Sequence, residues 1–467
     1  MLCGEVLERF LDESPLCVMT RGVLENFLPA QAVDELFAQT AQQQYTRELL
    51  FSGCVDLMAL VVARTYGSVK AAYLKRQEQL GVTLKCLYEK LQRTEAGLCS
   101  ALVRLTADKA QVVLRELGGA DRPLLPGYRL KVVDGNHLAA TQRRLKELRG
   151  HSAAPLPGWT LPVYDPDLGL VTDVILCEDG HAQERLLQDE VLALVQPGEV
   201  WVADRNFCLI DLLQGVARRE AFFVVRRHEQ VTVQPQGAYS AEVATETGWV
   251  SECRAQVLRD GQVELEVRLL RVRLQQPTQD GDSEIYLLTN LPAVVSATQV
   301  AAVYLGRWTI EVAFGELTVN LKCEVNTLAY PKAALFGFCV ALVMYNVLAV
   351  VKRAVAAKHG MATVQETLSS YYLAEEVAGV YRGMMIALPA ACWVEVQELS
   401  ARELAELLRG WAAQVDVRRY AKSRRRPKKK VERIDDGTPQ VSTARILARR
   451  KQTGEVEGVS DTRPKTP

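Results

Sequence analysis

The chain has 467 residues, of which 48% are apolar and 24% are charged, and its 56 basic residues balance its 56 acidic ones. This length allows about three domain-sized units, and the apolar fraction excludes a chain that is disordered throughout. Its eleven cysteines are scattered without a Cys-x-x-Cys pair, which is typical of reduced thiols in the cytoplasm and argues against a zinc ribbon or a disulfide framework.

The first 122 residues are predicted to be helical. Ser68 and Thr83 are residue types that cap helix N-termini. Short helices separated by a tight turn are compatible with a helix-turn-helix and equally with any small helical bundle. Apolar residues recur with helical spacing in segments 31–41, 48–64, 84–91 and 98–117.

The apolar pattern changes to that of strands near residue 127. Strands that first form a hairpin around a turn rich in Asp, Pro and Gly and then alternate with helices predict a mixed α/β sheet. The expected strands are 129–133, 161–164, 170–177, 199–203 and 221–226, and the expected helices are 181–195 and 209–219.

Residues 228–284 contain short apolar runs separated by Gly and Pro, which predicts an all-β insertion. A buried strand at 285–288 follows it, and Ser296 is expected to cap a long helix beyond. Helices are expected to continue to about residue 416. Residues 417–467 are polar and rich in Lys, Arg and Pro, so we expect them to be disordered.

Residues 333–351 form an apolar segment in which only Asn346 and the Tyr345 hydroxyl are polar. Its length approaches that of a membrane span. A helix that is buried on all sides in a large domain has the same composition. Because this is the only such segment and it follows a polar helix, we expect a buried helix and no membrane association.

Two of the predicted strands end in an aspartate, Asp134 and Asp204. Farther along, Tyr304, Arg307 and Glu311 are predicted to share one face of one helix, because at 100° per residue they lie within about 60° of one another. Phosphodiester cleavage by two divalent ions needs hard oxygen ligands. Carboxylates held together repel one another unless a cation binds between them. We therefore interpret Asp134, Asp204 and Glu311 as ligands of Mg²⁺.

Each of these residues also has a structural interpretation. Asp134 before Gly135 is a common turn signal, and Asp204 could cap the helix that follows it. Arg307 and Glu311 have the spacing of an ordinary surface ion pair. The functional interpretation depends on order and context: two strand-end aspartates followed by a glutamate within a helix.

These motifs resemble those of the DDE transposases of bacterial insertion sequences, specifically the cut-and-paste group numbered four. The resemblance covers residues from about 125 to 355, and the β insertion before the glutamate fits that group as well. Its specific motifs are Val133-Asp134-Gly135, Asp204-Arg205-Asn206-Phe207, and Leu287-Leu288-Thr289-Asn290-Leu291 followed by Tyr304-x-x-Arg307-Trp308-x-Ile310-Glu311.

The resemblance implies an RNase H-like catalytic core in which Asp134, Asp204 and Glu311 are the metal-binding triad. It also implies that Tyr304 and Arg307 lie near the DNA phosphates, where a guanidinium can bind phosphate oxygens in a bidentate way.

The chain departs from the family pattern at one position. The family has a lysine seven residues after the glutamate, where this chain has Thr318. Lys322, four residues farther along, is expected to point along the same helix face and to bind phosphate instead.

On this basis the chain divides into a helical DNA-binding domain (1–122), an RNase H-like core in two parts (123–227 and 285–360), a β insertion (228–284), C-terminal helices (361–416) and a basic tail (417–467). The N-terminal helices would recognise the terminal inverted repeats of the element. Salt-sensitive, non-specific DNA contacts are expected from the tail residues Arg424, Arg425, Arg426, Lys428, Lys429 and Lys430.

The expected function is that of a cut-and-paste transposase, cytoplasmic and associated with the nucleoid. Two Mg²⁺ ions, with Mn²⁺ as a substitute, would support hydrolysis at the element end, and the freed 3′-hydroxyl would later attack target DNA. Two ends must be held together, which implies at least a homodimer on double-stranded DNA. Two alternatives stay open: Thr318 fits a catalytically inactive DNA-binding protein with the same fold, and the triad fits a structure-specific nuclease that cuts without joining.

Overall fold

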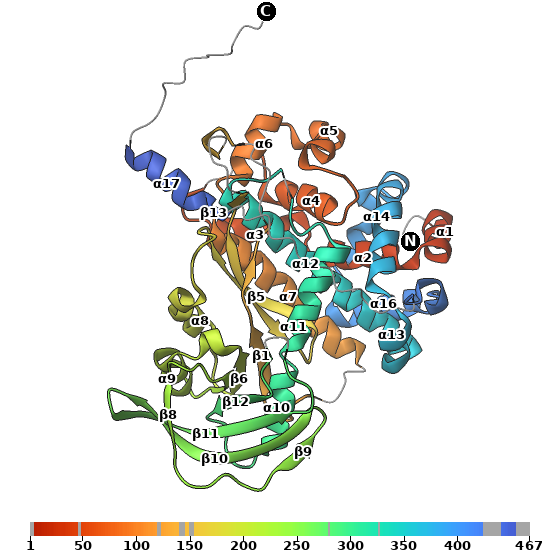
Figure 1. Ribbon diagram of the computed structural model, residues 1–467. Coiled ribbons are helices and arrows are strands. Elements are labelled where there is room, and N and C mark those ends of the chain that lie inside the picture. The colour runs from red at the N-terminus through yellow and green to blue at the C-terminus, as the bar shows by residue number, and fades with distance from the viewer. Residues whose placement is uncertain are drawn as a thin grey trace, which may run out of the picture.

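The computed structural model describes residues 4–44, 48–118, 123–139, 145–148, 154–278, 281–325, 327–423 and 440–453. A body of helices lies beside one end of a large mixed sheet, and the strands β8 to β11 form the end of the sheet that is farthest from this body (Figure 1).

The main sheet has eleven strands in the order β2-β4-β1-β6-β7-β12-β11-β10-β8, with β5 paired to β4 and β9 paired to β10. Its strands are β1 (Arg129–Val133), β2 (Asn136–His137), β4 (Trp159–Asp165), β5 (Leu170–Cys177), β6 (Glu199–Ala203), β7 (Phe222–Arg226), β8 (Thr232–Pro235), β9 (Val243–Thr245), β10 (Gly248–Arg259), β11 (Gln262–Leu274) and β12 (Glu284–Thr289).

Three neighbouring strands, β1, β6 and β7, are parallel, and α9 (Ile210–Arg218) connects β6 to β7. The hairpin of β4 and β5 lies on the other side of β1, and its strand β4 pairs with β1 in antiparallel orientation. A parallel pair needs such a helical crossover, whereas an antiparallel pair needs only a turn. The mixed α/β fold expected from the sequence is therefore confirmed.

Both faces of the parallel strands are buried, which explains their nearly continuous apolar sequence. In β6, Val200 and Val202 face the core shared with the helical body. Trp201 and Ala203 face a second core, to which α8 (Gln188–Leu194) and α9 contribute. The alternation follows from the two-residue period of a strand.

The insertion expected at 228–284 is built of strands, but these strands extend the main sheet. β12 pairs with β7 on one side and with β11 on the other. The several short strands expected between 249 and 274 are two long ones, β10 and β11. They are joined at Asp260 and Gly261, which both have positive φ (50° and 81°), as a two-residue Asp-Gly hairpin turn requires.

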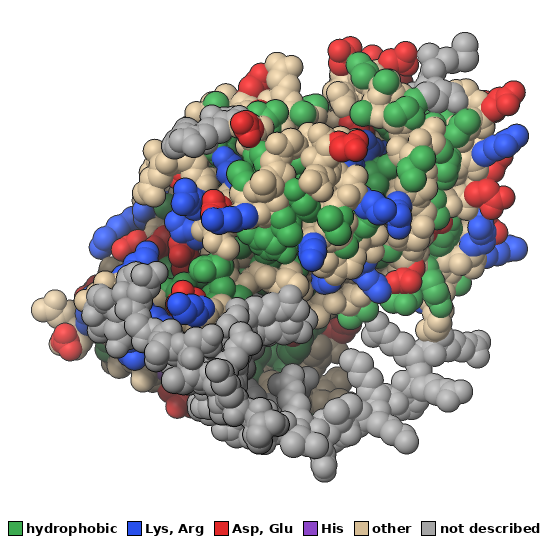
Figure 2. Space-filling model, turned by 90° about the horizontal axis from the view of Figure 1, so that it is seen from above, with side chains coloured by type: hydrophobic (Ala, Val, Ile, Leu, Met, Phe, Trp, Pro, Cys, Tyr) green, Lys and Arg blue, Asp and Glu red, His purple; other side chains and the backbone are tan. Residues whose placement is uncertain are grey.

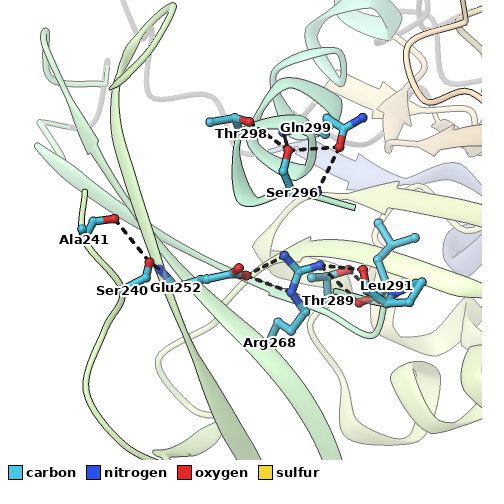
Figure 3. Close-up of polar contacts among 10 residues, drawn as sticks. Ser240, Ala241, Glu252, Arg268, Thr289, Leu291, Ser296, Thr298 and Gln299 are labelled. Carbon is cyan, nitrogen blue, oxygen red and sulfur yellow. Dashed lines mark hydrogen bonds and ion pairs between the residues drawn. The ribbon is translucent and has the colours of Figure 1, made fainter. Parts of the chain in front are cut away.

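Arg268 of β11 fixes the insertion to the chain that leads toward the helices (Figure 3). Its Nη2 binds Glu252 Oε2 at 2.6 Å, and its Nη1 donates to the Leu291 carbonyl at 3.3 Å. Shortly after, Ser296 caps α10 (Ala297–Leu305) in a capping box with Gln299, so the cap expected at Ser296 is confirmed.

The helical body takes its helices from both ends of the chain. Asn26 Nδ2 donates to the carbonyls of Val396 and Leu399, each at 2.9 Å, and a Cβ added to Gly22 would lie 2.6 Å from the Trp411 ring. Helices from 1–122 and from 361–416 thus pack together. They are α1 (Gly4–Glu13), α2 (Pro15–Phe27), α3 (Ala30–Thr40), α4 (Phe51–Val62), α5 (Val69–Leu80), α6 (Leu84–Leu91), α7 (Ala96–Leu117), α13 (Met361–Thr367), α14 (Ser370–Ala387), α15 (Val394–Gln397) and α16 (Ala401–Ala412).

The molecule seen from above has basic and acidic side chains interspersed among exposed hydrophobic ones (Figure 2).

Within the helical body the expected caps are confirmed: Ser68 accepts from Ala71 N and Thr83 accepts from Cys86 N, each at 3.2 Å. Which residues of 1–122 contact DNA stays a prediction.

The segment of near-membrane-spanning composition lies in α12 (Pro331–His359), and 89% of its most apolar window is buried in the fold. Its one amide, Asn346, is fully buried. Asn346 Oδ1 accepts from Val171 N at 2.9 Å and Nδ2 donates to Val171 O at 2.8 Å. Val171 belongs to β5, an edge strand whose outer backbone groups have no neighbouring strand. We conclude that α12 is a core helix that covers the edge of the sheet.

The helix expected at 181–195 is shorter than predicted. Asp179 Oδ1 accepts a hydrogen bond from His181 N at 3.0 Å, which stabilises a turn in place of the first helical residues. A 3₁₀ segment, η2 (Glu184–Leu187), follows and leads into α8.

The disorder expected for 417–467 is wrong for two parts of it. η5 (Val417–Tyr420) continues the helical body, and β13 (Gln440–Ser442) pairs in parallel with β3 (Ala154–Leu156). α17 (Thr443–Thr453) follows, and its Ile446 is buried against Leu148 of η1 (Lys146–Leu148). The basic residues predicted at 424–430 lie outside the described residues.

Cysteines in the described part of the chain are mostly free, as expected. Burial raises the pKa of Cys17 and Cys339 well above the usual value, which makes these thiols unreactive. The expectation of reduced thiols is wrong for Cys392, which is disulfide-bonded.

Replacing Asn346 by Leu should destabilise the fold. Leucine fills a similar volume but leaves the Val171 N–H and C=O unpaired in the core, so we expect a loss of about 2–4 kcal/mol in the free energy of unfolding. Urea unfolding followed by circular dichroism measures it, with Leu348→Met on the same helix as a control for mild core changes. Wild-type stability for Asn346→Leu would show that the two hydrogen bonds do not hold α12 on β5.

Candidate active site

The two aspartates lie together at one edge of the sheet. β1 and β6 pair in parallel from Arg129 with Glu199 to Val132 with Val202. Asp134 and Asp204 follow these strands at equivalent positions, so both side chains leave the carboxyl edge of the sheet, where parallel α/β sheets bind ligands. The structure thus brings together the two aspartates that the sequence singles out.

Each aspartate is oriented by the turn that follows it. Asp134 Oδ1 accepts a hydrogen bond from Gly135 N at 2.9 Å. Asp204 Oδ1 accepts one from Asn206 N at 2.8 Å and caps the 3₁₀ segment η3 (Arg205–Phe207), not the helix α9. The turn and cap interpretations are therefore correct for one carboxylate oxygen of each aspartate. They do not involve the second oxygen.

Arg307 connects the first aspartate to the glutamate. Its Nη1 binds Asp134 Oδ2 at 2.9 Å, and its Nη2 binds Glu311 Oε1 at 3.0 Å. Only 11% of the Arg307 side chain is exposed, and its Nε is buried without a hydrogen-bond partner among the described residues. The pair of Arg307 and Glu311 is therefore part of a three-residue ionic network and not an isolated surface pair.

The single helix expected to carry Tyr304, Arg307 and Glu311 is two helices. α10 ends at Leu305 and α11 (Trp308–Asn320) begins after Arg307. The Arg307 N–H bonds the Tyr304 carbonyl at 3.1 Å, in the tighter 3₁₀ pattern. Thr309 Oγ1 donates to the Gly306 carbonyl at 2.7 Å, and such a side-chain bond competes with the helical ladder. Tyr304 is buried, and burial raises the pKa of its hydroxyl, whereas the Arg307 charge opposes that shift.

A fourth carboxylate, Glu184 at the start of η2, belongs to the same site. The pKa of Glu184 is raised to about 7, chiefly by burial and then by the negative charges of Asp204 and Asp134. Sequence reasoning missed this residue because no motif surrounds it, and it reaches the site only through the turn that replaces the first part of the expected helix.

The electrostatics of Asp134 are those of a crowded acidic site. The pKa of Asp134 is raised to about 6, because burial and the charges of Asp204 and Glu311 together outweigh the lowering effect of Arg307. One guanidinium therefore compensates only part of the charge that Asp134, Glu184, Asp204 and Glu311 would carry when ionised. This is the environment in which a bound cation is favoured.

The donor set fits a hard divalent cation such as Mg²⁺, because all four side chains offer oxygen. Glu184 Oε2 is buried and has no hydrogen-bond partner among the described residues, so one oxygen is free to bind. Within the described part of the chain, no three acidic, His or Cys side chains already stand in metal-binding positions. Arg307, which lies between Asp134 and Glu311, would have to give up one of its two contacts when a cation binds.

A cavity of about 700 Å³ adjoins the triad. It lies between α10 and the β insertion and is lined by Asp204, Tyr304 and Arg307 on one side and by residues near Thr247 and Gln275 on the other. Its polar and charged lining next to an apolar floor is typical of a ligand site. Asp204 therefore borders a space that can receive a substrate.

Lys322 is not where the sequence predicts it. α11 ends at Asn320, and Leu321 is extended, so Lys322 lies beyond the helix and not on the face of Glu311. Its N–H donates to the Val62 carbonyl at 2.8 Å and its Nζ to the Gly67 carbonyl at 2.5 Å. Thr318, in contrast, lies exposed on α11, two turns after Glu311.

Glu316 anchors the helix that carries Glu311. Its carboxylate accepts from Lys352 Nζ of α12 at 2.6 Å and from Ser370 Oγ of α14 at 2.7 Å. Burial raises the pKa of Glu316, but the Lys352 ammonium and the two hydrogen bonds outweigh burial, and the net shift is downward. The orientation of α11 is thus set by a charge-assisted network on the side away from the site.

Comparisons with known proteins agree with these observations. Residues 129–347 match the family described as "Transposase DDE domain". A curated relative in Sinorhizobium fredii, named "Putative transposase y4zB", is 27% identical over 165 residues, which are 34% of this chain and 44% of the relative. The match thus spans less than half the length of that relative. Together these two matches confirm the resemblance to DDE-type insertion-sequence transposases.

Among solved structures, the chain is similar to a piggyBac transposase in a synaptic complex with hairpin DNA. The sequence identity is 10% and the TM-score is 0.36, over 90% of this chain and 87% of the other. A TM-score this low does not establish a common fold.

Replacing Glu316 by Gln should reduce stability in a pH-dependent way. Because the folded-state pKa is lowered, the contribution of Glu316 is present above the unfolded-state pKa of about 4.3 and is lost as the pH falls through the folded value. At neutral pH we expect the variant to lose about 1–3 kcal/mol in the free energy of unfolding, and this difference should shrink as the solution is acidified.

Denaturant unfolding at several pH values measures the effect of Glu316→Gln. The matched control is Glu406→Gln, whose exposed pair with Arg402 should contribute little. Equal losses for the two variants at neutral pH would contradict the anchoring role of Glu316.

Proposed function

We propose that this protein, a DDE-type insertion-sequence transposase by its family match, cuts DNA at the ends of its element and joins these ends to target DNA. The observation that carries the proposal is the convergence of Asp134 and Asp204 at one sheet edge, with Glu311 tied to Asp134 through Arg307. These side chains supply oxygen ligands for divalent ions beside a cavity.

We further infer that the catalytic core is RNase H-like. The order β5-β4-β1-β6-β7 supports this, because an antiparallel three-stranded meander leads into two parallel strands. Asp134 and Asp204 then follow adjacent central strands, and Glu311 comes from a helix after the insertion. The proposed core thus consists of 123–227 and 285–360, interrupted by the β insertion.

In the proposed reaction, Asp134, Asp204 and Glu311 hold two Mg²⁺ ions, and Mn²⁺ would substitute for Mg²⁺. Such ions, when bound, activate a water or a 3′-hydroxyl and stabilise charge on the leaving oxygen. Arg307 holds two of the carboxylates in place before the substrate arrives, and its guanidinium lines the cavity where a phosphate would bind. Tyr304 lines the same cavity as Arg307.

DNA is the substrate that best fits this arrangement. The cavity beside the triad is also lined by Arg205 and Arg226, which supplies positive charge for phosphates. We propose that the end of the element enters here, that helices of 1–122 bind the terminal inverted repeats, and that the basic residues of 424–430 add non-specific contacts. Joining two ends to one target requires at least a homodimer on DNA. The protein would then act in the cytoplasm, at the nucleoid.

A second candidate function is DNA binding without catalysis. Thr318 favours it, because the family pattern has a lysine there and Lys322 is held by the Val62 and Gly67 carbonyls. A nuclease that cuts without joining is the third. A transposase forms strand-transfer products, whereas such a nuclease does not. Metal-dependent cutting distinguishes both of these enzymes from an inactive DNA-binding protein.

The first test is cleavage and strand transfer on a duplex that carries the DNA ends flanking this gene. With Mg²⁺ or Mn²⁺, wild type should cut and join, whereas Asp134→Asn, Asp204→Asn and Glu311→Gln should each lower the rate by roughly 10²–10³-fold or more while still binding the duplex. Glu366→Gln, an exposed carboxylate on α13, is the matched control. Binding without cutting by wild type would contradict the proposed reaction and favour the inactive protein.

Restoring the lysine of the family pattern should strengthen DNA binding. Thr318 is exposed on α11, and a lysine there would lie on the face of Glu311. We expect Thr318→Lys to bind the end duplex more tightly and to steepen the slope of log K against log salt by about 0.9, the value for one added phosphate contact. Gln262→Lys, at the exposed β10–β11 turn, adds the same charge elsewhere. If both variants give the same slope, Thr318 does not face the bound DNA.

A further inference from the structure

We propose that Glu184 is a fourth ligand of the divalent-metal centre, which therefore contains four carboxylates and not three. This inference rests on the proposed function, since it concerns the same metal centre. It adds a residue from η2 to the triad of Asp134, Asp204 and Glu311.

The first observation is how closely Glu184 approaches the strand end. A Cβ added to Gly135 would lie 2.3 Å from Glu184 Oε1 and 2.8 Å from the Trp159 ring. Gly135 is not among the glycines with positive φ, so its backbone conformation is open to other residues. A side chain at position 135 would instead displace the Glu184 carboxylate from its place beside the end of β1. The Asp-Gly motif thus makes room for the fourth carboxylate.

The second observation is the missing partner of the other oxygen. Glu184 Oε2 is buried, and no donor among the described residues contacts it. The indole N–H of Trp159, whose ring also lies against Gly135, is buried and unpartnered as well, so these two groups are not bonded to each other. A buried carboxylate oxygen without a donor is costly, and a cation is a partner that suits it.

The third observation is the charge around Glu184. Asp204 and Asp134, which are both acidic, raise the pKa of Glu184, and its buried Oε2 has no hydrogen-bond partner among the described residues. A structural glutamate in a protein interior is normally paired with a base. Glu184 instead lies beside two like charges, and a bound cation would keep all three carboxylates ionised.

The fold holds Glu184 in this place from both sides. Before it, Gly180 N donates to Ser442 Oγ of β13 at 3.1 Å, and Asp179 Oδ2 binds Arg445 Nε of α17 at 2.5 Å. After it, Arg185 Nη1 donates to Gln230 Oε1 at 3.1 Å. The turn that presents Glu184 is therefore anchored to the C-terminal segment and to the start of the insertion, as a pre-positioned ligand requires.

The test compares wild type, Glu184→Gln and Glu190→Gln as full-length proteins. Glu190 is an exposed carboxylate on α8 and serves as the matched control. Mn²⁺ affinity is measured by isothermal titration without DNA, and the midpoint of thermal unfolding is measured in EDTA and with Mg²⁺. Cleavage of the end duplex is measured in parallel.

We expect Glu184→Gln to weaken Mn²⁺ binding by about tenfold or more and to reduce the Mg²⁺-induced rise of the unfolding midpoint. In EDTA the same variant should unfold at a temperature equal to or above that of wild type, because the amide removes repulsion from Asp134 and Asp204. Glu190→Gln should match wild type in all measurements. If Glu184 had a merely structural role, Glu184→Gln would unfold in EDTA at a lower temperature than wild type.

Unchanged Mn²⁺ affinity in Glu184→Gln would overturn the proposal, even if cleavage were slower, since Glu184 would then act on the reaction by another route. A lower unfolding midpoint in EDTA would overturn it as well. These failures differ from a failure of the proposed function, in which wild type itself would neither bind Mn²⁺ nor cut DNA.

Discussion

The site depends on one constraint, the in-register parallel pairing of β1 with β6. A parallel pair directs the carboxyl ends of both strands to the same edge, and the pairing of Val132 with Val202 sets Asp134 level with Asp204. A one-residue shift of either strand would turn the aspartate of that strand to the opposite face. The hydrophobic cores on the two faces of the sheet prevent such a shift, because Val200 and Trp201 each fit only one of them.

The two halves of the molecule contribute differently to this arrangement. The sheet supplies Asp134 and Asp204, whereas the helical body holds α11, and with it Glu311, through the bonds of Glu316 to Lys352 and Ser370. Arg307 joins the two halves by binding a carboxylate from each. The position of the glutamate relative to the aspartates is thus a matter of tertiary packing.

The sequence predicts the strand-end aspartates and the caps at Ser68, Thr83 and Ser296 well, because these depend on neighbouring residues alone. It fails at Lys322, whose place is decided by the end of α11 and by the distant carbonyls of Val62 and Gly67. The break at Gly306 was missed for a similar reason, since helical periodicity continues through it while one Thr309 hydroxyl alters the bonding. Glu184 was not found because nothing near it in the sequence indicates where its turn will lie.

The docking of β13 and α17 has a consequence for the order of events during synthesis. Ser442 and Arg445 hold the turn that presents Glu184, yet they are translated after β1, β6 and α11. A nascent chain that has already folded its sheet and its Arg307 network lacks this last support. The fully anchored site can therefore form only after Ser442 and Arg445 have been synthesised.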